Sequence, residues 1–142
     1  MRLTVATLAD FAEVREGLLF VSGAGIDQVF VATVPIPLPL TLALLVQIEP
    51  RDGSPLELKI SVDVRKQGQR PLTQINGLVK GSLRDPSRNG QVSLAIDLRM
   101  ATIPDEGRYR VDAVIGAKRF SFPFDVQVRM PPFQLNEPDV EG

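Results

Sequence analysis

Two pairs of acidic residues have the types and spacing that come closest to a catalytic or metal-binding set. Asp105 and Glu106 stand together in the segment PDEG, and Asp10 and Glu13 are three residues apart near the start of the chain. Two carboxyl groups provide the acid and the base of most glycosidases, and carboxylate oxygens are usual ligands of calcium. Carboxylates in loops serve more often as turn formers and solvated charges, and we favour that interpretation for both pairs.

The sequence contains no histidine and no cysteine. A zinc site of the usual kind, a cysteine nucleophile, a Ser-His-Asp triad and a histidine proton shuttle are therefore excluded. Other catalysis would need a carboxyl, lysine or tyrosine with a strongly shifted pKa, and the pattern places none of these groups in an apolar pocket. We therefore predict a protein that is not an enzyme and that carries no cofactor or metal.

The segment SGAGID, residues 22–27, has two glycines with the first spacing of a dinucleotide-binding fingerprint. Gln28 replaces the third glycine of that fingerprint, and the following QVFVATV alternates like a strand rather than a helix. The segment instead predicts a turn in which Gly23 or Gly25 adopts a positive φ.

Five arginines on outward rows of the predicted strands raise the question of an anion-binding face. Three aspartates share these rows, so ion pairs between neighbouring strands are the simpler expectation. The arginines are Arg99, Arg108, Arg110, Arg119 and Arg129, and the aspartates are Asp97, Asp112 and Asp125.

The segment PIPLPLTLALLVQIE, residues 35–49, is rich in leucine and carries no charge before Glu49. Its apolar part ends at Val46 and is too short for a transmembrane helix, which needs about 20 residues. The three prolines are spaced two apart rather than as P-x-x-P, which argues against a proline-reading partner. From residue 40 to 48 every second residue is Leu, Val or Ile, and this period of two predicts a core strand with prolines at its entry.

The same alternation recurs in three further segments and determines the predicted fold class. It is clear over residues 56–65, 91–99 and 119–129, where one row is apolar and the other is mostly polar. Strands with one wet face form antiparallel sheets, which pack in pairs. We predict an all-β protein with a single sandwich domain over residues 1–130 and an acidic, proline-containing tail over residues 131–142.

Two regions have weaker patterns. Residues 72–83 predict only a short strand near Leu78 to Leu83. In the N-terminal quarter, LTVATL and GLLFVSGAG are typical of strands, and ADFAEVREG between them fits either a helical turn or a bulged strand.

The aromatic residues are mostly assigned to the core. Three phenylalanines occupy the inward row of the last strand. We predict Phe122 at the centre of the sandwich, facing Leu42 or Leu44 and Ile60.

The segment DEGRY, residues 105–109, is the most specific motif of the chain. The motif joins the predicted strand SLAIDLRM, residues 93–100, to the predicted strand YRVDAVIG, residues 109–116. Its residues Asp105, Gly107 and Tyr109 form a D-x-G-x-Y that resembles the tyrosine corner of immunoglobulin-like sandwiches. The resemblance spans roughly residues 40–129 and implies an immunoglobulin-like antiparallel β-sandwich of seven to nine strands. It also implies that Tyr109 is buried, with its hydroxyl bonded to backbone near residues 103–106. The chain has no disulfide to join the sheets and no tryptophan, so aliphatic and phenylalanine packing must hold them together.

The N-terminal segment LADFAEVREGLLFVSGAGID resembles the start of an uncharacterised bacterial or phage family of small β-sandwich domains of unknown function. The matching features are Ala-Asp-aromatic-Ala at residues 9–12, Gly-x-Leu at residues 17–19, and the glycine pair Gly23 and Gly25. The resemblance implies a fold and a bacterial or phage origin, and it implies no activity.

The charge balance and the N-terminal residues bear on partners and location. A net charge of −1 argues against nucleic acid as a partner. Asp10, Glu13 and Glu16 interrupt what would be the apolar stretch of a signal peptide, so we expect a cytoplasmic protein with no membrane partner. A component of a virion is an alternative.

We predict a structural or protein-interaction module that works in a homo-oligomeric or hetero-oligomeric assembly. Four apolar residues are candidates for the contact with a protein partner or a second copy. Leu45 and Val114 lie on outward rows, and Phe133 and Leu135 stand in the acidic tail. The alternative is a β-sandwich that binds a small ligand or a carbohydrate, for which exposed aromatic side chains would be the usual sign.

Overall fold

The structure is a computed structural model that describes residues 1–52, 56–85 and 87–129. Within these residues the chain is almost entirely β-strand, which confirms the predicted all-β class. The strands are β1 (Arg2–Arg15), β2 (Leu18–Ala24), β3 (Gln28–Val31), β4 (Ile36–Pro37), β5 (Thr41–Ile48), β6 (Leu56–Lys66), β7 (Pro71–Gly81), β8 (Gly90–Asp97), β9 (Thr102–Ile103), β10 (Gly107–Ile115) and β11 (Lys118–Val128), and a 3-10 helix, η1, spans Pro50–Asp52.

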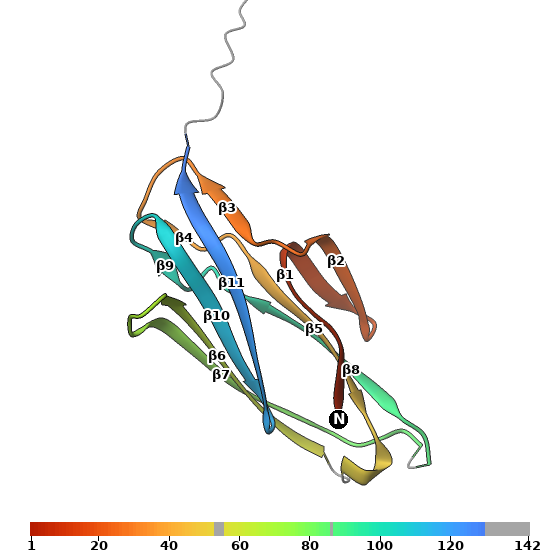
Figure 1. Cartoon of the computed structure of the whole chain (residues 1–142). Helices are drawn as coiled ribbons and strands as arrows, with labels where there is room; N and C mark the ends of the chain where they lie inside the picture. The colour runs from red at the N-terminus through yellow and green to blue at the C-terminus, as the bar shows by residue number, and fades with distance from the viewer. Residues whose placement is uncertain (53–55, 86, 130–142) are drawn as a thin grey trace, which may run out of the picture.

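The strands form two facing sheets (Figure 1). The smaller sheet has four strands in the order β2-β1-β5-β8, and the larger has five in the order β3-β11-β10-β6-β7. The described neighbours are antiparallel except for β3 and β11, which run parallel. The short strands β4 and β9 pair with each other. The predicted sandwich of antiparallel sheets is present, and the immunoglobulin-like assignment stays a prediction.

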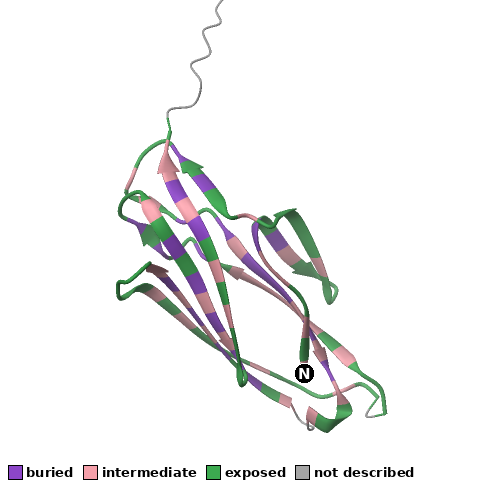
Figure 2. Cartoon of the chain, in the orientation of Figure 1, coloured by how far each residue is buried: buried purple, intermediate pink, exposed green. Residues whose placement is uncertain are grey.

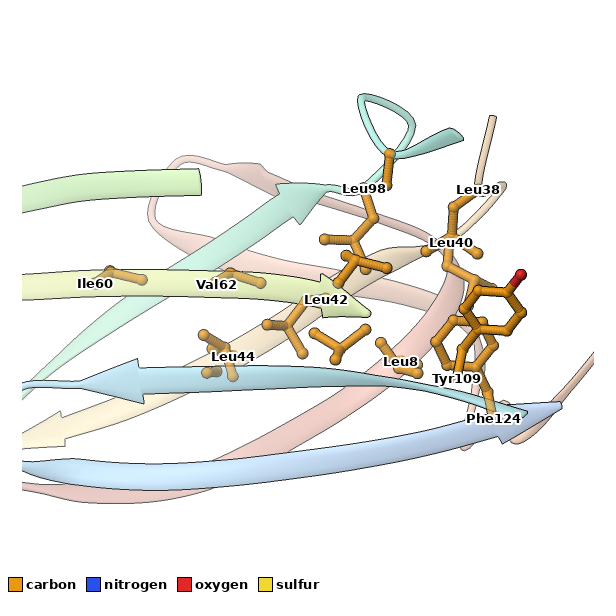
Figure 3. Packing of buried hydrophobic residues seen from close by; sticks show 14 of the residues in the cluster. Leu8, Leu38, Leu40, Leu42, Leu44, Ile60, Val62, Leu98, Tyr109 and Phe124 are labelled. Carbon is orange, nitrogen blue, oxygen red and sulfur yellow. The ribbon is translucent and has the colours of Figure 1, made fainter. Parts of the chain in front are cut away.

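Strand β5 supplies the centre of the core from the smaller sheet. Leu42, Leu44 and Val46 are fully buried between the sheets, as the alternation predicts. Figure 3 shows the leucines of β5 in one layer with Ile60 and Val62 of β6. Burying a side chain of this size stabilises the fold by roughly 1.5–3 kcal/mol, so this row of β5 is a principal source of stability.

Strands β6 and β10 show the predicted alternation most clearly. Their buried residues alternate with exposed or half-buried ones along almost the whole length of each strand, as the alternating colours in Figure 2 show. The weakly patterned region is different from the prediction: β7 is a full strand that begins at Pro71, not a short one near Leu78 to Leu83. It lies at the edge of the larger sheet, where most of its side chains are exposed and polar residues therefore stand on both rows.

The prediction of Phe122 as the most central phenylalanine was wrong by two residues, because Phe124 on the same row takes that place. Phe124 is 1% exposed, whereas Phe122 is only half-buried at the margin of the core. The Phe124 ring stacks on Tyr109 with 5.7 Å between the ring centroids. Figure 3 shows this pair at the end of the core that also holds Leu38 and Leu40. Both phenylalanines lie on the predicted inward row, so the row was right and the depth was wrong.

Strand β1 serves two purposes along its length. Its first part pairs with β5 from Arg2 to Ala9, and its second part, from Ala9 on, pairs with β2. The segment ADFAEVREG is therefore strand up to Arg15, and the one register shift of β1 against β5 falls earlier, between Leu3 and Val5. We call the hairpin of residues 9–24 the hairpin arm.

The hairpin arm turns tightly and lies over the outer side of the smaller sheet (Figure 1). Glu16 and Gly17 both have positive φ, 52° and 77°, as a two-residue turn between twisted strands requires. At the tip, the Ser93 hydroxyl of β8 donates to the Gly17 carbonyl at 2.9 Å. At the base, the Gly25 amide donates to the Thr7 hydroxyl at 2.8 Å. The arm is thus held to the sheet at both ends.

The two phenylalanines provide a direct test of the depth of the core. Phe124→Ala removes a fully buried ring and its stacking on Tyr109, so we expect a loss of about 3–5 kcal/mol. Phe122→Ala removes a ring that is partly in water and should cost clearly less. Urea unfolding of both variants measures the difference. An equal or larger loss for Phe122→Ala would show that the core is centred as the sequence predicted.

Candidate functional site

Tyr109 organises the turn before β10. Its ring is fully buried, and its hydroxyl donates at 2.7 Å to the Asp105 carbonyl and lies 2.8 Å from the carboxylate oxygen Oδ1 of the same residue. Gly107, between them, has a φ of 144°, a conformation that favours glycine. The expected backbone bond of a tyrosine corner is therefore present at Asp105, Gly107 and Tyr109.

Charges around the corner shift two pKa values in opposite directions. The Lys66 ammonium donates to Asp105 Oδ1 at 2.9 Å, and this bond, followed by that from the tyrosine hydroxyl, holds the pKa of Asp105 below its ordinary value. Burial, followed by the bond to the Asp105 carboxylate, raises the pKa of Tyr109 from 10.0 to about 12. A neutral tyrosine and an ionised aspartate fit a structural role.

Three of the four acidic residues first considered for catalysis, Asp105, Glu106 and Glu13, bond to other groups of the fold. The Glu106 carboxylate accepts a hydrogen bond from the Val128 amide at 2.8 Å, which ties the turn before β10 to β11. Near the start of the chain, Glu13 forms an ion pair with Arg15 at 2.7 Å, and Asp10 lies beside Gly23 on the opposite strand of the arm. Among the described residues no group of three or more acidic side chains gathers where it could hold a metal ion.

Three of the five arginines are neutralised by the aspartates on their rows. Arg108 pairs with Asp125 across β10 and β11 at 3.1 Å, so this pair joins neighbouring strands as expected. The pairs of Arg99 with Asp97 and of Arg110 with Asp112, at 2.8 Å and 2.9 Å, instead connect residues two apart along the chain.

The predicted contact residues do not form one surface. Leu45 lies on β5 of the smaller sheet and Val114 on β10 of the larger sheet, and both are half-buried. Val114 borders a shallow hollow of about 590 Å³ with Lys59, Asn76 and Leu78. Phe133 and Leu135 lie outside the described residues.

The hairpin arm holds the exposed apolar residues that the sequence analysis did not single out. Five of the ten large apolar side chains that are exposed in the described structure belong to residues 9–24, so the arm is the most apolar part of the surface. They are Phe11 (53% exposed), Val14 (40%), Leu18 (61%), Phe20 (42%) and Val21 (38%). Figure 2 shows the exposure of β2 along nearly its whole length.

One face of the arm is the more aromatic. Phe11, Leu18 and Phe20 lie on the same row of cross-strand pairs, as their partners Ser22, Arg15 and Glu13 show. The Arg15 guanidinium lies 4.3 Å from the centre of the Phe20 ring and covers one side of it.

The exposure of these rings corrects the assignment of aromatic residues to the core. Of the phenylalanines in the described structure, Phe11, Phe20 and Phe30 are exposed and only Phe124 is fully buried. A signal was available in the sequence: residues 17–26, GLLFVSGAGI, have no charge and no proline, and apolar residues occupy both rows of their strand.

The comparison with family models decides what this chain is related to. A family model with the description "Family of unknown function (DUF6941)" matches residues 4–127. The chain belongs to DUF6941. The match includes both strands of the arm and the tyrosine corner, so these features lie within the DUF6941 domain. The resemblance to an uncharacterised family is confirmed at this level. Comparison with curated proteins found no match.

Membership of DUF6941 assigns no activity, and the structure adds one fact about membranes. Within the part of the chain that the structure describes, no helix has the length and apolar character that a membrane span requires.

Removal of the tyrosine hydroxyl tests the corner. Tyr109→Phe keeps the ring and leaves the Asp105 carbonyl without its bond, so we expect a loss of about 1–2 kcal/mol in the free energy of unfolding. Urea unfolding measures it. A variant as stable as the wild type would show that water replaces the hydroxyl without cost.

Alkaline titration tests the raised pKa. Tyr109 is the single tyrosine of the chain, so the near-ultraviolet absorbance of phenolate reports on it alone. We expect a midpoint near 12. The folded-state pKa lies above the ordinary value, so the neutral tyrosine contributes its full stabilisation below pH 10.0. This contribution should be lost as the pH rises towards 12. A midpoint near the ordinary value while circular dichroism still shows a folded protein would contradict the assignment.

Proposed function

We propose that this DUF6941 protein is a non-enzymatic protein-interaction module that binds its partner through the hairpin arm. The observation that carries the proposal is the concentration of exposed Phe, Leu and Val side chains on residues 9–24. Scattered exposed apolar residues are normal on soluble proteins, whereas a contiguous group marks a contact surface.

The composition of the arm fits a protein contact. Aromatic side chains and arginine are enriched in protein interfaces, and charged residues are depleted at their centres. Phe11, Leu18 and Phe20 supply the apolar centre, and Arg15 and Glu13 form a charged pair beside it. Removing such apolar surface from water contributes about 25 cal/mol per Å², so covering the arm is favourable.

A small ligand or carbohydrate is the second candidate, and the exposed rings of Phe11, Phe20 and Phe30 favour it. A shallow hollow of about 270 Å³ beside Phe11 also includes Asp97 and Arg99. These two side chains already bond to each other through three contacts of 2.8–3.1 Å. Their hydrogen-bonding groups are therefore largely occupied, and protein binding by the apolar arm remains the better supported function.

Substitutions on the arm test the proposed function in the native assembly. The tagged protein is isolated under mild conditions from cells that express it naturally, and native mass spectrometry measures the mass of its complexes. We expect a complex heavier than the chain of 15.5 kDa, and we expect Leu18→Ser with Phe20→Ser to abolish it. Both residues are exposed in the single chain, so the variant should still fold.

The matched control is Leu72→Ser with Leu78→Ser, which removes two exposed leucines from β7 in the larger sheet. We expect this control to retain the complex. A complex that survives the arm variant, or that both variants lose equally, would contradict the arm as the binding surface. An isolated wild-type protein that is always a bare monomer would contradict the function itself.

A further inference from the structure

The outer edge of β2 is open to another strand. Within the described structure, β2 pairs only with β1, and it ends the smaller sheet. The residues on the two sides of a two-residue turn exchange both backbone bonds, so Leu18 and every second residue after it direct their amides to β1. The register of Arg15 with Leu18, Glu13 with Phe20 and Phe11 with Ser22 continues this alternation along β2. Leu19 and Val21 therefore direct their backbone groups away from the sheet.

Two other open edges of the fold carry the protection that edge strands usually have. Strand β7 begins with Pro71 and contains Lys80. The first part of β11 contains Lys118 and Pro123. The Arg129 amide donates to the Val31 carbonyl of β3, and the Asp125 amide donates to the carbonyl of Asp27, the residue before β3. Every second residue of a strand directs its backbone nitrogen to the same edge, so the nitrogen of Pro123 lies on this edge too, where β11 has not yet met β3. Residues 17–26 contain neither a charge nor a proline, and the edge of β2 is unprotected.

The sequence of β2 complements itself. Its first three residues, Leu18, Leu19 and Phe20, are large, and its last three, Ser22, Gly23 and Ala24, are small, with Val21 between them. Antiparallel pairing of two copies about Val21 places each large residue opposite a small one: Leu18 opposite Ala24, Leu19 opposite Gly23, and Phe20 opposite Ser22 of the second copy. In this register the outward-directed Val21 faces Val21 of the second copy, as a hydrogen-bonded pair of an antiparallel ladder requires. Gly23 has a φ of 68°, so its pair with Leu19 of the second copy forms when this glycine extends, a change that glycine makes without steric cost.

Charge also favours a second copy as the occupant. A two-fold axis through a charged strand brings like charges close to each other, and like charges opposite each other destabilise a sheet. Residues 17–26 avoid this cost because none of them is charged.

We propose that two copies of this protein associate by antiparallel pairing of their β2 strands about Val21, joining the two arms into one four-stranded sheet. This inference rests on the proposed function and names its partner. The pairing places Phe20 of one copy on the same row as Ser22 and Phe11 of the other, so the exposed aromatic faces of the two arms become continuous. The contact is small, and we expect a dimer that dissociates on dilution.

Sedimentation equilibrium of the purified protein over a range of concentrations tests the pairing. We expect the mass to rise from 15.5 kDa towards twice that value. Val21→Pro removes the outward amide that lies on the two-fold axis of the proposed dimer. The substitution breaks no bond to β1, because edge strands accept proline where the amide faces solvent. It should raise the dissociation constant at least about ten-fold, while Val21→Thr, which keeps the amide and the branched shape, should stay within roughly three-fold. Circular dichroism verifies that each variant is folded.

Two more variants keep the proposal falsifiable. Ser22 is exposed in the single chain, so Ser22→Lys should leave the arm folded. The lysine fills the small position opposite Phe20 of the second copy and should weaken the dimer. This variant therefore tests the pairing even if Val21→Pro distorts the arm. Gln91→Pro places the same block on β8, the other edge of the smaller sheet, and should leave the dimer intact. The Leu98 amide donates to the Leu40 carbonyl, which directs the odd-numbered amides of β8 outward.

The outcomes separate this inference from the function it rests on. A wild type that remains monomeric at every concentration, or a dimer broken by Gln91→Pro and not by Val21→Pro, would overturn the β2 pairing. If the arm variant Leu18→Ser with Phe20→Ser still lost a native complex of other mass, the proposed function would stand with a different partner.

Discussion

The burial of β5 on both of its faces is the constraint on which the rest of the fold depends. Its inward row packs against the larger sheet, and Ala43 on its outward row is also fully buried. A strand of this kind needs neighbours on both edges and cover on both sides. The pairs with β1 and β8 satisfy the edges, and the hairpin arm, held at Thr7 and Ser93, lies over the outer side.

The position of the arm explains why its outer residues are left in water. The arm comes closest to the rest of the domain at its small residues Ala9 and Ala12, since both are buried. Its larger residues Phe11, Leu18 and Phe20 share the row of Ala9 and lie beyond it, where pairing with β5 has ended, so they stay exposed. The apolar surface of the arm is therefore a consequence of how the domain closes its own sheet, and it is available for an intermolecular contact.

The sequence was sufficient where burial follows a simple alternation. The strands β5, β6, β8, β10 and β11 and the corner at Tyr109 were predicted because one row of each strand is apolar and the turn has a specific motif. Strand β7 was underestimated because an edge strand in water has polar residues on both rows. Depth within a row, which separates Phe124 from Phe122, depends on packing between the sheets and has no local signal. The candidate site was missed for the same reason: a pattern shows that Phe11 and Phe20 are apolar, but only the fold shows that both rings are exposed.

Hydrogen exchange of individual backbone amides at low and high protein concentration tests the central claim most directly. The amides of Leu18 and Phe20 point to β1 and should be protected at both concentrations. Those of Leu19 and Val21 point outward, and their exchange should be fast in dilute protein and slow markedly as the concentration rises. Fast exchange of Leu19 and Val21 at every concentration would show that the edge of β2 stays in water and would contradict the account.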